Sequence, residues 1–296
     1  MKEKIKCKKC HLSIDADSKI CPYCGYNQEE PDIPKVEKKK KDKKENLELN
    51  LNRGSLTFHR AEGAFSLANL KHIAILFIQL FVMQLIVLIV NQILISCDMI
   101  NKVGADATQA LLTLISYPIL LVLLLLSLWK DFIPVCKTFK YWKNILYGLG
   151  LGVGILTFTL LYNMFIEAVG GASSNDNQQV VEKAITLYPA GCVIVLGFIG
   201  PMCEEISYRL GLYGLIRKKN MWVALVVSSL IFGLIHFNFA VDTKEGLINE
   251  LINLPSYIIS GAILAFGYEI GGLGTSITAH VTNNLIATIV VLVQSL

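Results

Sequence analysis

Charged side chains are scarce in this sequence: only 17% of its 296 residues are Asp, Glu, Lys or Arg, and 53% are hydrophobic. Soluble globular domains usually carry about 25% charged residues. The shortage begins after His72, where the chain falls into long uncharged runs, and the mean hydropathy of the whole chain is +0.53. This part of the chain is therefore predicted to be a membrane protein and not a soluble domain.

The chain also lacks a signal peptide and a disulfide pattern. No apolar core precedes His72, so we expect the N-terminus to stay in the cytoplasm. Four of the eight cysteines form two CxxC units near the start, and the other four are scattered without pattern. This usage indicates a metal site and excludes a disulfide framework.

Several motifs of other protein classes are missing. Glycines alternate from Gly148 to Gly154, but no P-loop lysine follows, so we interpret them as small-residue packing of a membrane helix. The Lys-rich run from Lys35 to Lys44 has no interleaved aromatic residues, which argues against nucleic acid as a partner. We see no internal repeat between the two halves, the pattern expected of a transporter.

Seven stretches contain no Asp, Glu, Lys or Arg and are long enough, or nearly so, to cross a hydrocarbon core that needs about 20 apolar residues. Since backbone polar groups cannot stay unpaired in lipid, each stretch is predicted to be an α-helix. The expected fold class is an all-α, polytopic transmembrane bundle. Its predicted spans are 72–97, 107–129, 144–166, 184–203, 220–241, 251–268 and 270–296.

The loop charges predict how these spans are oriented, because short cytoplasmic loops carry an excess of Lys and Arg. The loop at 130–143 and the turn at 217–219 are rich in basic residues, whereas the loops between the other span ends carry one Lys each beside several acids. We expect a multi-pass protein of the cell membrane with a cytoplasmic N-terminus. The turn at 270–274 has no basic residue, so the orientation of the last hairpin rests on the span count alone.

The N-terminal region is predicted to bind Zn²⁺. Cys7 and Cys10 form one CxxC unit, and Cys21 and Cys24 form a second, followed by Gly25. Four thiolates at this spacing can surround one ion tetrahedrally, and such a closed site is structural. A redox dithiol, or a histidine in place of one cysteine, is a weaker interpretation because four thiolates already close the site. The partner of this region cannot be named from the sequence.

Three regions follow from these patterns. Residues 1–27 are predicted to be a zinc ribbon, 28–71 a Lys-rich linker, and 72–296 a transmembrane domain. Next to a membrane helix, a polybasic linker is expected to contact anionic head groups of the lipid bilayer.

Charged residues close the fourth predicted span, a place where charge is costly and usually functional. Glu205 and Arg209 are four residues apart and can pair along one helix face. Glu204 lies about 100° round the helix from its neighbour and has no partner at that spacing. Its side chain must therefore face something on another helix.

Two later spans carry candidate partners for Glu204. His236 lies in the fifth predicted span, and His280 lies in the seventh, four residues before Asn284 and on the same helix face. If spans four and five form an antiparallel hairpin, Glu204 and His236 face each other at one level. We expect these groups to line a cavity that opens on the cytoplasmic side.

The patterns EExxxR, FxxxH and HxxxN, in this order on successive membrane helices, resemble the three motifs of the CAAX protease and bacteriocin-processing family. That family includes the type II CAAX prenyl endopeptidases and the abortive-infection proteins. The resemblance covers about residues 145–296. The matching positions are Glu204, Glu205, Arg209, Phe232, His236, His280 and Asn284.

The resemblance implies an intramembrane endopeptidase of the glutamate type, acting on a membrane-associated peptide or protein such as a CAAX protein or a bacteriocin precursor. Glu204, together with His236, would activate a water for attack on a peptide carbonyl. His280 and Asn284 would donate hydrogen bonds to the developing oxyanion. The charged pair after Glu204 would hold that side chain in place.

Two alternatives remain. Two histidines and a glutamate can bind a catalytic Zn²⁺, but the chain has no HExxH pair and the similar prenyl endopeptidases work as glutamate proteases, so a catalytic metal is not favoured. A non-catalytic membrane immunity or binding protein could keep the same residues for helix packing.

Overall fold

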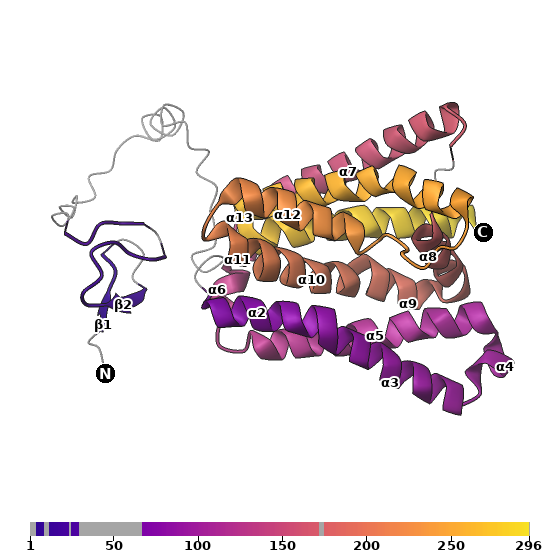
Figure 1. Cartoon of the computed structure of the whole chain (residues 1–296), viewed down its shortest axis with the longest axis horizontal. Coiled ribbons are helices and arrows are strands. Elements are labelled where there is room, and N and C mark those ends of the chain that lie inside the picture. The colour runs from indigo at the N-terminus through magenta and orange to yellow at the C-terminus, as the bar shows by residue number, and fades with distance from the viewer. Residues whose placement is uncertain (1–3, 9–11, 24, 30–66, 172–174, 296) are drawn as a thin grey trace. The chain divides into compact units, whose positions relative to one another are not determined.

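The computed structural model describes residues 4–8, 12–23, 25–29, 67–171 and 175–295. Contacts divide the chain into two units, Met1–Phe58 and His59–Leu296. The boundary between the units falls inside the segment predicted to be a linker. The first unit contains two short strands, and the described part of the second unit is a bundle of helices (Figure 1).

In the first unit, β1 (Lys4–Lys6) pairs antiparallel with β2 (Ser13–Asp15). Cys7 follows β1 directly and is buried with Cys21 and Ile14 in one small core. Gly25 has a φ of 70°, which confirms that the turn after the second CxxC unit needs a glycine.

The predicted zinc site can be examined only in part, because Cys10 and Cys24 lie outside the described residues. Cys7 and Cys21 share a core, and Cys7 Sγ accepts a hydrogen bond of 3.3 Å from Gln28 Nε2. Two buried thiols side by side fit half of a tetrahedral thiolate site. The Zn²⁺ ion itself stays a prediction.

The second unit confirms the all-α, polytopic fold. Its elements in chain order are α2 (Asn69–Phe77), η1 (Ile78–Val82), α3 (Met83–Ser96), α4 (Met99–Val103), α5 (Ala105–Ser127), α6 (Phe132–Cys136), η2 (Lys137–Lys140), α7 (Trp142–Ala168), α8 (Asp176–Leu187), α9 (Pro189–Ile194), η3 (Val195–Ile199), α10 (Gly200–Glu204), η4 (Glu205–Tyr213), α11 (Gly214–Arg217), α12 (Met221–Leu234) and α13 (Lys244–Gln294). Several of these run on from one another, so the described residues contain 5 continuous helices long and apolar enough to cross a membrane.

The first three predicted spans agree with the structure, where the helices run over Asn69–Ser96, Ala105–Ser127 and Trp142–Ala168. The last two predicted spans are the two halves of α13. They meet at Gly272, whose φ of 66° and ψ of −158° are accessible to glycine but not to other residues without strain. Gly267 packs beside Ser276, so the two halves form a tight antiparallel hairpin.

The boundaries of the fourth and fifth predicted spans are wrong. The fourth begins at Pro189 and continues past Glu204 to Arg217, and residues before Tyr188 belong to the separate helix α8. The fifth helix, α12, ends at Leu234 and is followed by irregular backbone. The end of an uncharged run does not mark the end of a membrane helix when the next charged residues pair inside the protein, because paired charges can stay within the membrane.

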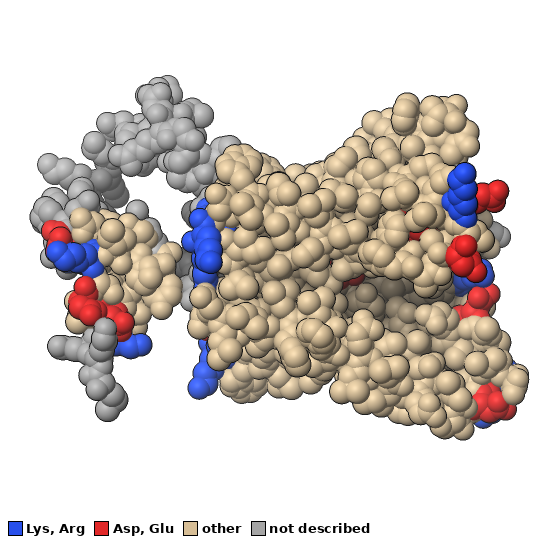
Figure 2. Space-filling view, in the orientation of Figure 1, with Lys and Arg blue, Asp and Glu red and all other residues tan. Residues whose placement is uncertain are grey.

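The two ends of the bundle differ in charge (Figure 2). We call one the basic end, where the segments 130–143 and 217–219 carry most of the Lys and Arg, and the other the acidic end. The hairpin turn of α13 lies at the basic end, because Asn144 Nδ2 donates to Gly271 O at 3.0 Å and Gly274 N donates to Thr138 Oγ1 at 2.9 Å. The packing of Gly271 and Gly274 therefore shows at which end of the bundle the last hairpin turns, which the charges of the loops did not indicate.

Helix α7 packs closely against the second half of α13, as the alternating glycines predict. A Cβ atom at Gly148 or Gly152 would lie 2.6 Å from Cβ of Thr278 or Thr282 respectively, which no side chain tolerates. Gly150 and Gly154 face open space. Only Gly148 and Gly152, which share one face of α7, make the close contact, and their spacing of four residues is typical of small-residue packing.

Candidate active site

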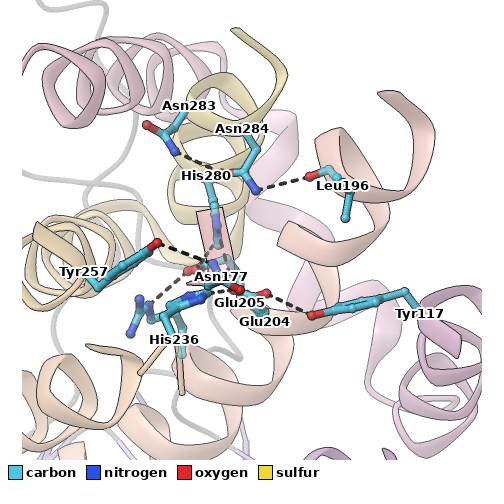
Figure 3. A network of polar contacts seen from close by, with 11 residues as sticks. Tyr117, Asn177, Leu196, Glu204, Glu205, His236, Tyr257, His280, Asn283 and Asn284 are labelled. Carbon is cyan, nitrogen blue, oxygen red and sulfur yellow. Dashed lines mark hydrogen bonds and ion pairs between the residues drawn. The ribbon is translucent and has the colours of Figure 1, made fainter. Parts of the chain in front are cut away.

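Glu204 lies at the end of α10, in the middle of the continuous helix Pro189–Arg217. Its Oε2 atom is 4.0 Å from His236 Nε2 and 3.9 Å from His280 Nε2 (Figure 3). Tyr117 OH donates a long hydrogen bond of 3.4 Å to the other carboxylate oxygen. Oε2 is buried and makes no hydrogen bond to the described residues. The distances from Oε2 to the two histidine nitrogens are too long for direct hydrogen bonds. Each is short enough for a water molecule to bridge the carboxylate and the imidazole.

The pairing of Glu205 and Arg209 is confirmed. Arg209 Nε donates to Glu205 Oε2 at 3.1 Å, and both side chains are completely buried. The guanidinium of Arg209 also lies over the ring of Phe232, at 4.8 Å. Glu205 Oε1 is 3.0 Å from His280 Nδ1, so His280 stands between the two adjacent glutamates.

We call Glu204, Glu205, Arg209, His236 and His280 the motif cluster. Its members come from α10, η4, the segment after α12 and the second half of α13, and the ring of Phe232 touches both histidines edge to face. Groups far apart in the sequence are thus gathered round one buried carboxylate.

Asn284 hydrogen-bonds to a backbone carbonyl group that Pro201 leaves without a helical partner. The turn Val195–Ile199 is π-helical, and Gly200 N bonds to Val195 O, five residues back. The next residue in this pattern, Pro201, has no N–H for Leu196 O. Asn284 Nδ2 donates to that carbonyl at 3.2 Å. The chain before Pro201 therefore forms a wide π-helical turn within a continuous helix, and Asn284 connects this turn to α13.

Glu204, His236 and His280 of the motif cluster line a cavity of about 910 Å³, and so does Asn284, whereas Glu205 and Arg209 do not line it. The cavity reaches α8 and the residues Phe237 and Phe239, and a hollow is visible near the acidic end of the bundle (Figure 2). The expectation of an opening beside the basic turns is wrong. Toward the basic end, nearly every residue of η4 is buried, so packed side chains close that route.

The residues around this site are similar to a known protein family. Residues 186–286 match the family described as type II CAAX prenyl endopeptidase Rce1-like. We refer to this range as the Rce1-like region. It contains the whole motif cluster and Asn284, and it is shorter than the range of about 145–296 over which the motifs were compared.

Relatives are distant. The chain is 29% identical over 171 residues to an uncharacterised protein of Mycoplasma capricolum subsp. capricolum, covering 53% of this chain and 48% of that protein. It is 24% identical over 197 residues to a Bacillus subtilis protein named "Putative membrane peptidase YdiL", covering 66% and 74%. It is 28% identical over 126 residues to the UPF0177 protein YxdF of Lactococcus lactis, covering 41% and 69%. The match thus spans about half the length of the first relative, and no solved structure matches the chain.

Further polar groups, inside the Rce1-like region and just before it, were not predicted from the sequence. His236 does not lie within a helix but in the irregular segment after α12, where its ring stacks on Tyr257 at 4.6 Å. The backbone N–H of Asn238 donates to Glu250 Oε2 at 3.0 Å, and Asn175 Nδ2 donates to the same oxygen at 3.3 Å. Tyr257 OH donates to Asn175 Oδ1 at 3.3 Å.

We call Asn175, Asp176, Asn238, Glu250 and Tyr257 the support cluster. Glu250 is 2% exposed and also accepts a bond of 3.2 Å from the backbone N–H of Asp176. Irregular backbone at membrane depth is tolerated only where its polar groups are satisfied inside the protein. The support cluster provides hydrogen-bond partners for the polar groups of this segment and thereby holds His236 in position. The Asn–Asp pair at the start of α8, where Asn175 is the N-cap and Asp176 the first helical residue, was the one sequence signal for this cluster.

The motif cluster was also tested as a metal site. With zinc–ligand bonds of about 2.0–2.2 Å, ligand atoms of a tetrahedral site lie about 3.4 Å apart. The separations of 3.9 and 4.0 Å from Glu204 Oε2 to the two histidines are wider. No group of three or more potential ligands in metal-binding geometry is present among the described residues.

Proposed function

We propose that this chain is an intramembrane endopeptidase that hydrolyses a peptide bond in a membrane-associated substrate, using a water activated by Glu204 and His236. One observation carries the proposal: a buried carboxylate oxygen without a hydrogen bond faces two imidazole nitrogens at 3.9 and 4.0 Å in a large cavity. The match to an endopeptidase family over the same residues supports it.

In the proposed reaction, a water bound between Glu204 and His236 attacks the carbonyl carbon of the peptide bond. The water gives one proton to the Glu204 carboxylate, and a tetrahedral oxyanion forms. Glu204 then passes that proton to the leaving nitrogen as the C–N bond breaks. The products are a carboxylic acid and an amine, and the site returns to its starting state.

Stabilising the oxyanion requires hydrogen-bond donors, and the contacts of His280 and Asn284 limit when each of them can donate. Glu205 as a carboxylate can only accept, so His280 Nδ1 carries a proton, and His280 Nε2 donates only when the ring is charged. A charged ring would balance the two carboxylates together with Arg209. One amide N–H of Asn284 is used by Leu196 O, which leaves the second for the oxyanion.

Activity should depend on Glu204 and not on negative charge in general. Glu204→Gln removes the base and should lower the rate of cleavage by about 10²–10⁴-fold, measured on membrane-anchored peptides with purified protein. Glu245→Gln is the matched control, because Glu245 is exposed on the first turn of α13, away from the cavity. Equal activity of wild type and Glu204→Gln would overturn the proposal.

Two other outcomes favour the alternatives. Loss of cleavage on chelation, restored by zinc alone in a Cys7→Ser variant, would indicate a zinc-dependent variant of the same protease. No cleavage by wild type, together with a stoichiometric co-purified protein, would favour a non-catalytic immunity or binding protein. Zinc in the N-terminal unit is a separate proposal, tested by metal content before and after that cysteine substitution.

A further inference from the structure

The cavity occupies only one half of the bundle along its long axis. On α5 it is lined by Gln109, Thr113 and Tyr117, which lie between the start and the middle of that helix. On α7 it is lined between Ile155 and Asn163, in the second half. On the C-terminal half of α13, lining residues continue to Val291, close to the end. All three positions lie toward the acidic end.

The opposite half is closed. Among the described residues, none in the ranges 118–154, 209–230 and 265–279 lines the cavity. These are the segments that meet at the basic end, where Arg217 forms a two-point ion pair with Glu269 at 2.7 and 2.8 Å. The cavity is therefore a pocket with its floor at the motif cluster and its mouth at the acidic end.

Charge indicates which side of the membrane each end faces. Lys and Arg gather in the short segments of the basic end, and an excess of these residues marks the cytoplasmic side. Asp and Glu predominate at the other end, where Lys183 is paired with Asp106 at 3.3 Å (Figure 2). The mouth consequently faces away from the cytoplasm.

The lining has a distinct chemistry. It contains no Lys or Arg among the described residues, and it is rich in carboxamides: Gln79, Gln84, Gln109, Asn163, Asn177, Gln178, Asn253, Asn283 and Asn284. A carboxamide both donates and accepts hydrogen bonds, as a peptide backbone does. A free carboxylate in this cavity would find no Lys or Arg and would meet the carboxylates of Glu182 and Glu204, and burying it unpaired is costly.

From these observations we infer that the cavity receives an uncharged internal segment of a polypeptide from the extracytoplasmic side of the membrane. That the bound segment is then cleaved rests on the proposed function. The side of the membrane from which it enters and its lack of charge do not. It predicts a substrate cut within the chain and exposed outside the cytoplasm, and not a cytoplasmic protein held by its C-terminal carboxylate.

The side of entry can be tested by cysteine labelling. Gln109 and Lys140 are both exposed, the first at the cavity and the second at the basic end. In spheroplasts, a membrane-impermeant maleimide should label Gln109→Cys at least about tenfold faster than Lys140→Cys, and inverted vesicles should reverse the order. Native Cys97, exposed beside Asp98, should follow Gln109→Cys. Burial raises the pKa of the Cys136 thiol, so this native cysteine is a poor reporter for the basic end.

The chemistry of entry can be tested by protection. In a Glu204→Gln, Gln109→Cys protein, an uncharged peptide blocked at both ends should slow labelling about tenfold more than the same peptide with a free C-terminal carboxylate. Equal or better protection by the peptide with the free C-terminal carboxylate would contradict the inference that the bound segment is uncharged. Labelling of Gln109→Cys only in inverted vesicles would overturn the side. If both results hold but wild type cleaves no peptide, the proposed peptidase activity fails and this inference stands.

Discussion

The motif cluster and the support cluster are both buried and polar, yet they are built differently. The motif cluster contains two adjacent carboxylates balanced by Arg209 and two histidines. The support cluster has Glu250 as its one buried carboxylate, surrounded by neutral donors that include the backbone N–H groups of Asp176 and Asn238. Charge concentrated in one place suits acid–base chemistry, whereas neutral donors suit the fixing of an irregular backbone. The two clusters should therefore fail in different ways when they are altered.

The largest effect is expected from Arg209→Leu. This change leaves the Glu205 carboxylate buried without its cation, which should destabilise the protein by about 3–5 kcal/mol. Equilibrium unfolding in detergent would measure it. The double variant Glu205→Gln, Arg209→Leu removes both charges and should recover part of the loss. A single variant as stable as wild type would show that the pair does not compensate charge.

Next in size is Glu250→Gln in the support cluster. The amide oxygen of Gln can accept at only one of the two carboxylate positions, so its NH2 group must face the backbone N–H of either Asn238 or Asp176, which should cost about 1–3 kcal/mol. Misplacing His236 should lower kcat on the order of 10²-fold with little change in KM. Steady-state kinetics measures both constants, with Glu245→Gln as the control. A rise in KM at constant kcat would mean that Glu250 serves binding and not the position of His236.

The smallest effect is expected from Tyr257→Phe. The ring that stacks on His236 is kept, and the hydroxyl's two long hydrogen bonds, to Asn175 and from Asn177, are lost, so stability should fall by about 1 kcal/mol. Tyr257→Leu also removes the ring contact and should cost about 0.5–1.5 kcal/mol more. Thermal unfolding and cleavage rates of the two variants give the comparison. If they behave alike, stacking does not orient His236.

The fold was predictable where hydrophobicity alone decides it. The helices at Asn69–Ser96, Ala105–Ser127 and Trp142–Ala168 follow the uncharged runs closely. Prediction failed from Pro189 to Leu234, because internal pairing allows the first helix to carry Glu204, Glu205 and Arg209 through the bundle. It failed again after α12, where the support cluster satisfies backbone that lipid could not.

The site was predictable to the extent that its members carry unusual residue types. Glu204, His236 and His280 stand out as titratable groups in apolar surroundings, and the structure brings all three together. Glu250 did not stand out, because it looked like one acid among several in a polar loop. Its burial depends on partners from α8 and the segment after α12, and no sequence spacing relates those elements.

By itself, the sequence determined the membrane environment, the first helices and the pairing of Glu205 with Arg209, since these depend on hydrophobicity and on contacts within one helix turn. Only the tertiary structure decided that His236 lies outside a helix, that Glu250 holds it there, and that the cavity opens at the acidic end. Each of these depends on which elements pack side by side and where polar groups find partners, and those contacts join residues far apart in the chain.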